Sequence, residues 1–162
     1  TFEVPYESGK LEAVATTDGK EVARFAVETT GEPARLQLVT DRPSLAGDGC
    51  DAQPVTVEVV DAQGRVVPTA SPSVKFELSG PGAIIGLNNG DPNCHEPEKG
   101  AQHSVFHGLA QVILQSGLAS QGKLTLRATS EGLTPGEAVI DVAAAPARPA
   151  VPIAGPRRAS GN

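Results

Sequence analysis

The residues best suited to catalysis or metal binding fall in one polar stretch, GLNNGDPNCHEPEK, which spans residues 86–99. Its carboxylates, Asp91, Glu96 and Glu98, are the nearest approach to an acidic cluster in the sequence. Catalysis by a carboxylate pair, as in glycoside hydrolysis, needs two carboxyl groups held about 5 Å apart in a substrate cleft. The surrounding sequence shows no framework that would build such a cleft. We therefore expect a solvated loop, in which Asp91 bonds the backbone of a turn over residues 89–92.

A metal site is the second chemistry that this region could support. The candidate ligands are His95, His103 and His107, together with Cys94. Zinc sites usually carry paired spacings such as C-x2-C, and this set has none. His103 and His107 would share one face of a strand, but they flank the start of an apolar segment. We expect surface and turn histidines here, and no metal site.

Cys50 and Cys94 are the only two cysteines. Both fall in loops at the ends of expected strands, and a β-sandwich can bring such loops together. In an exported protein a cysteine pair suggests a disulfide, which at this loop length would stabilise by roughly 4 kcal/mol in the chain-entropy model. Because disulfide geometry is strict, two free thiols are the alternative. The sequence leaves both possibilities open.

The elements that must position these residues are strands. Val55, Val57 and Val59 alternate with polar residues, and the same alternation returns over residues 74–78. Between them, residues 61–64 (DAQG) supply turn chemistry, because Asp can bond its own following backbone and Gly adopts positive φ easily. This pattern predicts two half-buried antiparallel strands joined by a solvated connection. They would form the middle of a β-sandwich.

The rest of the chain repeats this pattern of short alternating strands and turns. Asp18-Gly19 is a strong two-residue hairpin signal, and residues 42–50 are expected to form a loop with Leu45 near the core. The further strands are expected at residues 34–38, 84–85, 104–115, 124–129 and 138–142. With no helical periodicity anywhere, we predict an all-β fold, an Ig-like antiparallel β-sandwich.

We divide the chain into three parts. Residues 1–31 are expected to be the last two or three strands of a preceding β-domain, because so few strands are marginally stable alone. Residues 32–142 are expected to form the sandwich. Residues 143–162 are rich in Pro and Ala without periodicity, which predicts a linker or disordered tail.

Composition excludes several classes of function. The formal net charge of -6 and the pI near 5.0 argue against nucleic acid or an anionic membrane as a partner. The sequence contains no run of 18 apolar residues, so we expect no membrane span. It begins without an initiator Met or a signal-peptide profile, so we expect a start within a longer protein. A periplasmic or secreted location is favoured over the cytoplasm.

Several motifs, in order, resemble one enzyme family. The run VPYESGKLEAVATTDGKEVARFAVETTGEPARLQL is similar to a junction between accessory β-domains in bacterial glycoside hydrolase family 2 β-galactosidases. The stretches FELSGPGAIIGLNNGDPNCHEP and FHGLAQVILQS resemble the Ig-like, invasin-type domain that follows there. The likeness covers roughly residues 2–142. The sequence departs from the family pattern at Ser8, Cys50 and Cys94.

This resemblance implies a non-catalytic accessory fragment of a β-galactosidase. The family's two catalytic glutamates lie on a TIM barrel upstream, and none of their motif is present, so the resemblance implies no catalytic residue and no cofactor here. The expected partner is the rest of the glycosidase, with a homo-oligomer as a further expectation; the loop at residues 88–98 could also reach another domain. The alternative is a carbohydrate-binding or adhesive Ig-like module, which the single Tyr (Tyr6) and the absence of Trp weaken.

Overall fold

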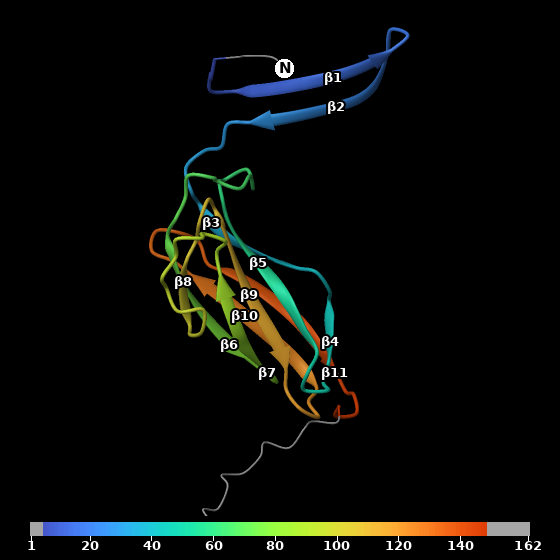
Figure 1. Cartoon of the computed structure of the whole chain (residues 1–162), viewed down its shortest axis with the longest axis vertical. Helices are drawn as coiled ribbons and strands as arrows, with labels where there is room; N and C mark the ends of the chain where they lie inside the picture. The colour runs from blue at the N-terminus through green and yellow to red at the C-terminus, as the bar shows by residue number, and fades with distance from the viewer. Residues whose placement is uncertain (1–4, 149–162) are drawn as a thin grey trace, which may run out of the picture.

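The computed structural model describes residues 5–148 and confirms an all-β protein (Figure 1). Residues 1–4 and 149–162, which include most of the predicted disordered tail, lie outside the described residues. In residues 5–148 the chain forms no helix, and hence none suited to crossing a membrane. The strands are β1 (Lys10–Thr17), β2 (Lys20–Glu28), β3 (Arg35–Thr40), β4 (Ser44–Ala46), β5 (Ala52–Val60), β6 (Ser73–Ser79), β7 (Gly82–Asn88), β8 (Gln102–Ser104), β9 (Leu109–Ser116), β10 (Gly122–Thr129) and β11 (Gly136–Ala143).

Two sheets pack face to face to form the sandwich. The five-stranded sheet has the order β4-β11-β10-β6-β8, and the four-stranded sheet has the order β3-β5-β9-β7. Neighbouring strands are antiparallel, except that β4 runs parallel to β11. The chain passes repeatedly from one sheet to the other, as in Ig-like sandwiches.

The core consists of the inward-facing residues of both sheets. On β5, Val55, Val57 and Val59 are fully buried, whereas Thr56 and Glu58 between them are half-buried. The opposite sheet contributes, among others, Phe76, Leu124, Leu126 and Ile140. Because the inward residues are mostly Val, Leu, Ile and Ala, the two sheets form a thin core of branched side chains.

The strands β5 and β6 are not partners, although the sequence suggested an antiparallel pair. Strand β5 pairs with β3 and β9, while β6 pairs with β10 and β8. The twelve-residue connection between them carries the chain from one sheet to the other, so their apolar faces meet across the core. Alternation fixes which side of a strand is buried, but it does not identify the neighbouring strand.

Two further local predictions need correction. Residues 42–50 were expected to be loop, but they include β4, which places Leu45 in the core at 1% exposure. Residues 104–115 were expected to be one strand, but β8 ends at Ser104 and β9 begins at Leu109 in the other sheet. Between them, His107 and Gly108 have φ values of 51° and 80°, as a tight two-residue turn requires.

The predicted hairpin at the N-terminal end is confirmed. Strands β1 and β2 form a separate two-stranded sheet, whose turn residues Asp18 and Gly19 have φ values of 51° and 74°. All residues of both strands are exposed. Figure 1 shows the hairpin projecting beyond one end of the sandwich, to which residues 29–34 connect it.

Candidate functional site

The polar connection between β7 and β8 is folded rather than loose. Asn88 Oδ1 accepts a hydrogen bond from Gly90 N, and Asn89 Oδ1 accepts one from Asp91 N. Asp91 in turn accepts a bond from Asn93 N, as the predicted turn chemistry requires. These successive Asx turns bend the chain back toward β8.

The three carboxylates of this connection have different surroundings. Asp91 caps its turn, and Glu98 is exposed. Glu96 accepts hydrogen bonds from both the backbone N and the hydroxyl of Ser104 on β8. These two bonds, with a smaller contribution from nearby His103, lower the pKa of Glu96 against the opposing effect of burial. The arrangement makes Glu96 a tether between the connection and β8.

Of the four candidate metal ligands, the structure brings two together with Glu96. Cys94, Glu96 and His103 offer ligand atoms that all lie within 4.8 Å of one another. His103 was expected at the surface, but it is buried at 2% exposure because β8 pairs with β6, where His103 lies opposite Val74. We name these three residues the β8 cluster.

The other two histidines lie apart from this cluster. His95 is exposed in the connection. His107 occupies the turn before β9, where its Nδ1 lies 3.0 Å from the carbonyl oxygen of Pro68 and its ring lies against Phe106. For these two residues the expected surface and turn positions hold.

The disulfide considered between Cys50 and Cys94 is not formed, and both thiols are free. Ala52, which begins β5, and Ala83, near the start of β7, both pair with Gln115 of β9. Cys50 therefore lies at the end of the sandwich where β7 begins, whereas Cys94 lies beyond the end where β7 finishes. The length of β7 separates the two thiols.

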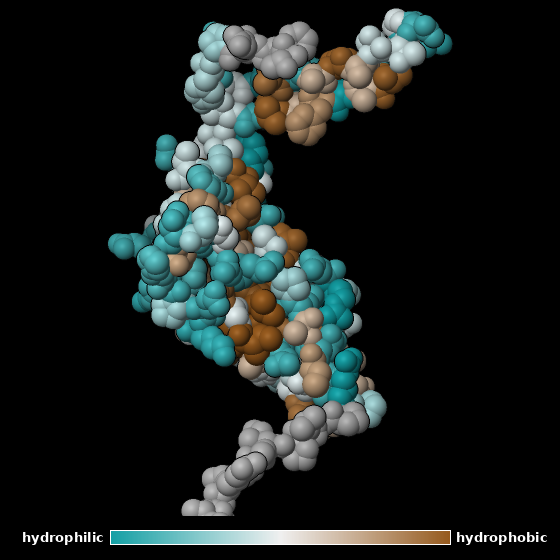
Figure 2. Space-filling view, viewed as in Figure 1, coloured by the Kyte–Doolittle hydropathy of each residue, from teal (hydrophilic) through white to brown (hydrophobic). Residues whose placement is uncertain are grey.

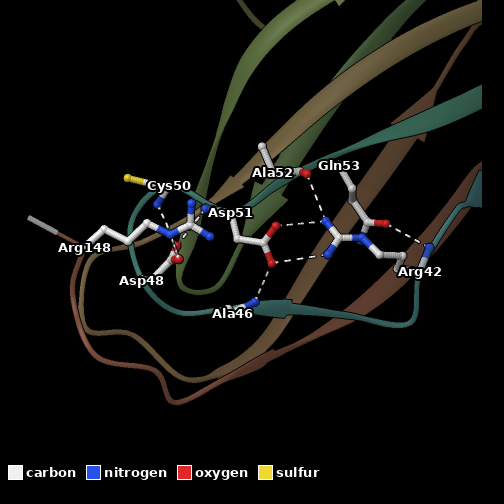
Figure 3. Close-up of polar contacts among 8 residues, drawn as sticks. All are labelled: Arg42, Ala46, Asp48, Cys50, Asp51, Ala52, Gln53 and Arg148. Carbon is white, nitrogen blue, oxygen red and sulfur yellow. Dashed lines mark hydrogen bonds and ion pairs between the residues drawn. The ribbon is translucent and has the colours of Figure 1, made fainter.

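A second polar cluster fixes the end of the sandwich that carries Cys50 (Figure 3). Asp48 accepts hydrogen bonds from the backbone N of Cys50 and Asp51, which lower the pKa of Asp48, and from Arg148 Nε at 2.6 Å. Asp51 pairs with Arg42 at 2.9 Å and accepts a bond from Ala46 N. These contacts hold the β4–β5 loop and the segment after β11, which is a structural role.

Asp61 joins the sandwich to the segment that leads from the hairpin. Its fully buried carboxylate accepts hydrogen bonds from the backbone N of Gly31, Gln63 and Arg65, and from Arg65 Nε at 2.8 Å. Burial alone would raise the pKa of Asp61, but these bonds and the guanidinium charge hold it far below its usual range. Arg65 also contacts Glu28 at 3.0 Å, at the end of β2.

The hairpin has one apolar and one polar face. The register places six apolar residues on the same face, namely Leu11, Ala13, Ala15, Ala23, Phe25 and Val27. Glu12 and Arg24 form an ion pair on the other face. Figure 2 shows apolar side chains gathered along one side of the hairpin. Phe25 is 70% exposed and Leu11 is 60% exposed, so the described residues leave most of this hairpin face open, with Pro5 and Tyr6 bordering only the end beside Leu11 and Val27.

These features define a β-sandwich with an amphipathic hairpin attached. Residues 36–139 match the family described as Glycoside hydrolase family 2 C-terminal domain 5. The chain belongs to this family, as its motifs suggested.

Known relatives are much longer enzymes. The chain is 38% identical over 143 residues to the β-galactosidase BoGH2A of Bacteroides ovatus, covering 88% of this chain and 16% of that protein. It is also 38% identical over 132 residues to a β-glucuronidase of Formosa agariphila, covering 80% of this chain and 13% of that one. The chain thus spans about a sixth or less of the curated relatives' length.

Solved structures agree with this placement. A glycosyl hydrolase family 2 member from Bacteroides cellulosilyticus superposes with a TM-score of 0.83 at 28% identity, over 86% of this chain and 18% of that chain. A family 2 β-glucuronidase superposes with a TM-score of 0.76 at 33% identity, over 87% of this chain and 15% of that chain. In both cases the matched share of this chain is larger than the stretch that the family model matches.

Proposed function

We propose that this chain is a non-catalytic accessory region of a larger family 2 glycosidase. In this proposal the sandwich packs against the catalytic part or sets its spacing, and the β1–β2 hairpin completes a neighbouring β-domain. The exposed apolar face of the hairpin carries the proposal. A two-stranded sheet with one apolar face is marginal in water unless another layer covers that face.

The covering layer is expected to be the rest of the glycosidase. The small share of each relative that this chain spans supports this choice, since most of such an enzyme lies outside the chain. The polar face, with its Glu12–Arg24 pair, suits contact with solvent. Association through the apolar face would bury Leu11, Phe25 and Val27, with a gain of roughly 25 cal/mol for each Å² of apolar surface.

The proposed substrates of the whole enzyme are terminal β-D-galactosides, hydrolysed with retention. The 38% identity to the Bacteroides ovatus β-galactosidase over 143 residues supports galactosides, and the equal identity to the Formosa agariphila β-glucuronidase makes glucuronides the alternative. The catalytic carboxylate pair belongs to the barrel of that enzyme. Here the acids of residues 86–99 are committed to turns, tethers or solvent.

The purified chain should not hydrolyse either a nitrophenyl β-galactoside or a nitrophenyl β-glucuronide. We expect the complete gene product to cleave the galactoside, because it would supply the missing barrel. The same two substrates, assayed on both proteins, test the accessory role and the substrate class separately. Turnover by the purified chain would contradict the accessory role, and a preference of the gene product for the glucuronide would contradict the substrate class.

Val27→Ser should destabilise the complete gene product, whereas Val139→Ser should not. Both valines are about half exposed in this chain, at 49% and 47%, but only Val27 lies on the hairpin face. If the rest of the enzyme covers that face, the remaining half of the Val27 side chain becomes buried, and the substitution removes about 1 kcal/mol of apolar burial. Thermal denaturation of the gene product measures the effect.

The matched substitution keeps this experiment specific. Val139 points outward from β11 and loses the same side-chain atoms, so it reports the effect of a Val→Ser change on an exposed strand position. In the purified chain both variants should melt like the unmodified protein. If Val27→Ser melts like the unmodified gene product, the hairpin face is not covered.

A further inference from the structure

We propose that the β8 cluster is a binding site for a divalent zinc ion. Cys94, His103 and Glu96 supply one sulfur, one nitrogen and one oxygen ligand, all within 4.8 Å of one another. Zinc accepts this mixture of ligands in a tetrahedral arrangement. The inference does not depend on the accessory role proposed above.

His103 is held in the orientation that metal-binding histidines adopt. Its Nδ1 lies 3.0 Å from the carbonyl oxygen of Ser104, which can only accept a hydrogen bond. Nδ1 therefore carries the proton, and Nε2 keeps its lone pair. A backbone carbonyl on the far ring nitrogen is a common device for fixing the metal-binding tautomer.

Cys94 lies directly in front of this lone pair. The distance between Cys94 Sγ and His103 Nε2 is 4.0 Å. With bonds of about 2.3 Å to sulfur and 2.0 Å to nitrogen, tetrahedral zinc needs these atoms about 3.5 Å apart. A small rotation of Cys94, which is only partly buried in a surface turn, would close the difference.

The position of Cys94 is built by the same loop that forms the turn. Its backbone N bonds the carbonyl oxygen of Asp91, and Asn89 Nδ2 bonds the Ser104 carbonyl oxygen that also orients His103. Asn89 of the β7–β8 connection and His103 of β8 thus both bond the carbonyl oxygen of Ser104. This shared attachment holds sulfur and imidazole on the same side of β8 before any ion binds, which lowers the cost of assembling a site.

Glu96 supplies the third ligand and the negative charge. Its carboxylate is bonded to Ser104, and its Oε2 lies 3.5 Å from His103 Nδ1, the protonated side of the ring, so the carboxylate must turn to reach an ion at Nε2. One oxygen can stay bonded to Ser104 while the other binds the cation. With the thiolate of Cys94 the site would carry two negative charges, and water would complete the tetrahedron.

The competing interpretation is a thiol that simply donates a weak hydrogen bond to the imidazole. Cobalt distinguishes the two, because Co²⁺ takes zinc's ligands and gives a charge-transfer absorption band only when sulfur is bound. We expect the reduced 162-residue chain to develop this band with one equivalent of Co²⁺. One equivalent of Zn²⁺ should abolish the band and protect one of the two thiols from a thiol reagent.

Three variants identify the ligands without disturbing the core. Cys94→Ser should abolish the band, and Glu96→Gln, which removes a charged ligand, should weaken Zn²⁺ binding by at least the roughly 10-fold that loss of an outer-shell partner costs. Cys50→Ser is the matched control, because it removes the other thiol at the opposite end of the sandwich and should leave the band unchanged. His103 is not substituted, since its burial links it to folding.

Each outcome decides the proposal. A band that survives in Cys94→Ser, or one that disappears in Cys50→Ser, places the ion elsewhere and overturns it. The absence of any band in the unmodified chain, with both thiols reactive in the presence of Zn²⁺, leaves only the hydrogen bond and also overturns it. Weakening by Glu96→Gln together with loss in Cys94→Ser supports the site as described.

Discussion

Replacing Leu114 with alanine should lower the free energy of unfolding by about 3–5 kcal/mol, a large part of the stability of a domain of this size. Leu114 is fully buried and lies on β9, between Gln53 of β5 and Ile84 of β7. Its side chain fills the space between the two sheets, and neither sheet can close over the cavity without bending. The loss therefore includes both the apolar transfer and the cavity.

The expected contrast is with Leu109→Ala on the same strand. Leu109 is 42% exposed, so its truncation should cost less than about 1 kcal/mol. Urea denaturation followed by circular dichroism is the appropriate measurement, because the chain has no Trp and its single Tyr lies beside the hairpin rather than in the core. Similar midpoints for the two variants would contradict the two-layer core.

The buried faces of the strands could be predicted from the sequence because they depend on local alternation. Val55, Val57 and Val59 are buried together, as their spacing of two requires. The hairpin turn at Asp18-Gly19 was equally predictable, since few residues adopt positive φ at two successive positions. In both cases the signal and the structure lie within a few residues of each other.

The pairing of strands could not be predicted from local alternation. The alternation at Ala110, Val112 and Leu114 predicts a single strand back to Ser104, yet the chain changes sheets between Ser104 and Leu109, with a turn at His107 and Gly108. A His-Gly pair is a weaker turn signal than Asp-Gly, so the apolar pattern concealed it. The same limit applies to β5 and β6, whose separation into opposite sheets depends on partners distant in sequence.

The β8 cluster shows what this limit means for a site. Cys94 and His103 were considered as ligands, and Glu96 was considered as an acid, but their sequence spacing resembles no common zinc motif. They meet because β8 pairs with β6, and because the β7–β8 connection folds back on the Ser104 carbonyl. His103 is buried because of that strand pairing, and this burial could not be predicted from the sequence.

The contacts of Asp61 could be predicted from the sequence only in part. Its bonds to Gln63 and Arg65 are the local turn chemistry that the sequence predicted. Its bond to Gly31, thirty residues earlier, and its complete burial depend on the closed sandwich. The local turn was therefore visible in the sequence, whereas the role of Asp61 in fixing the segment that leads to the hairpin was not.

Asp61→Asn should lower the melting temperature of the chain by an amount on the order of 10 °C at neutral pH. The carboxylate receives three backbone N–H groups and the guanidinium of Arg65, and all of them are donors. An amide has only one acceptor oxygen, so its NH2 group would face a donor in a buried place. The substitution also removes the buried partner of Arg65 and leaves only the exposed pair with Glu28, and thermal melts measure the sum.

The pH dependence identifies how much of this effect comes from the charge. Because the pKa of Asp61 is lower in the folded protein than in the unfolded chain, its ionised form stabilises the fold above the unfolded pKa of about 3.9. That contribution falls as the pH drops below about 5 and decreases further toward the folded pKa. The difference in stability between the unmodified chain and Asp61→Asn should therefore be largest at pH 7 and shrink steadily toward pH 3.

The difference between the two proteins isolates Asp61, since Asp48 and Asp51, whose pKa values are also lowered, remain in both. Asp141→Asn is the matched control. Asp141 pairs with Lys123 in solvent, at 66% and 71% exposure, so its loss should change stability by less than about 1 kcal/mol at any pH. If the deficit of Asp61→Asn is the same at pH 3 as at pH 7, the stabilisation comes from hydrogen-bond geometry and not from the buried charge.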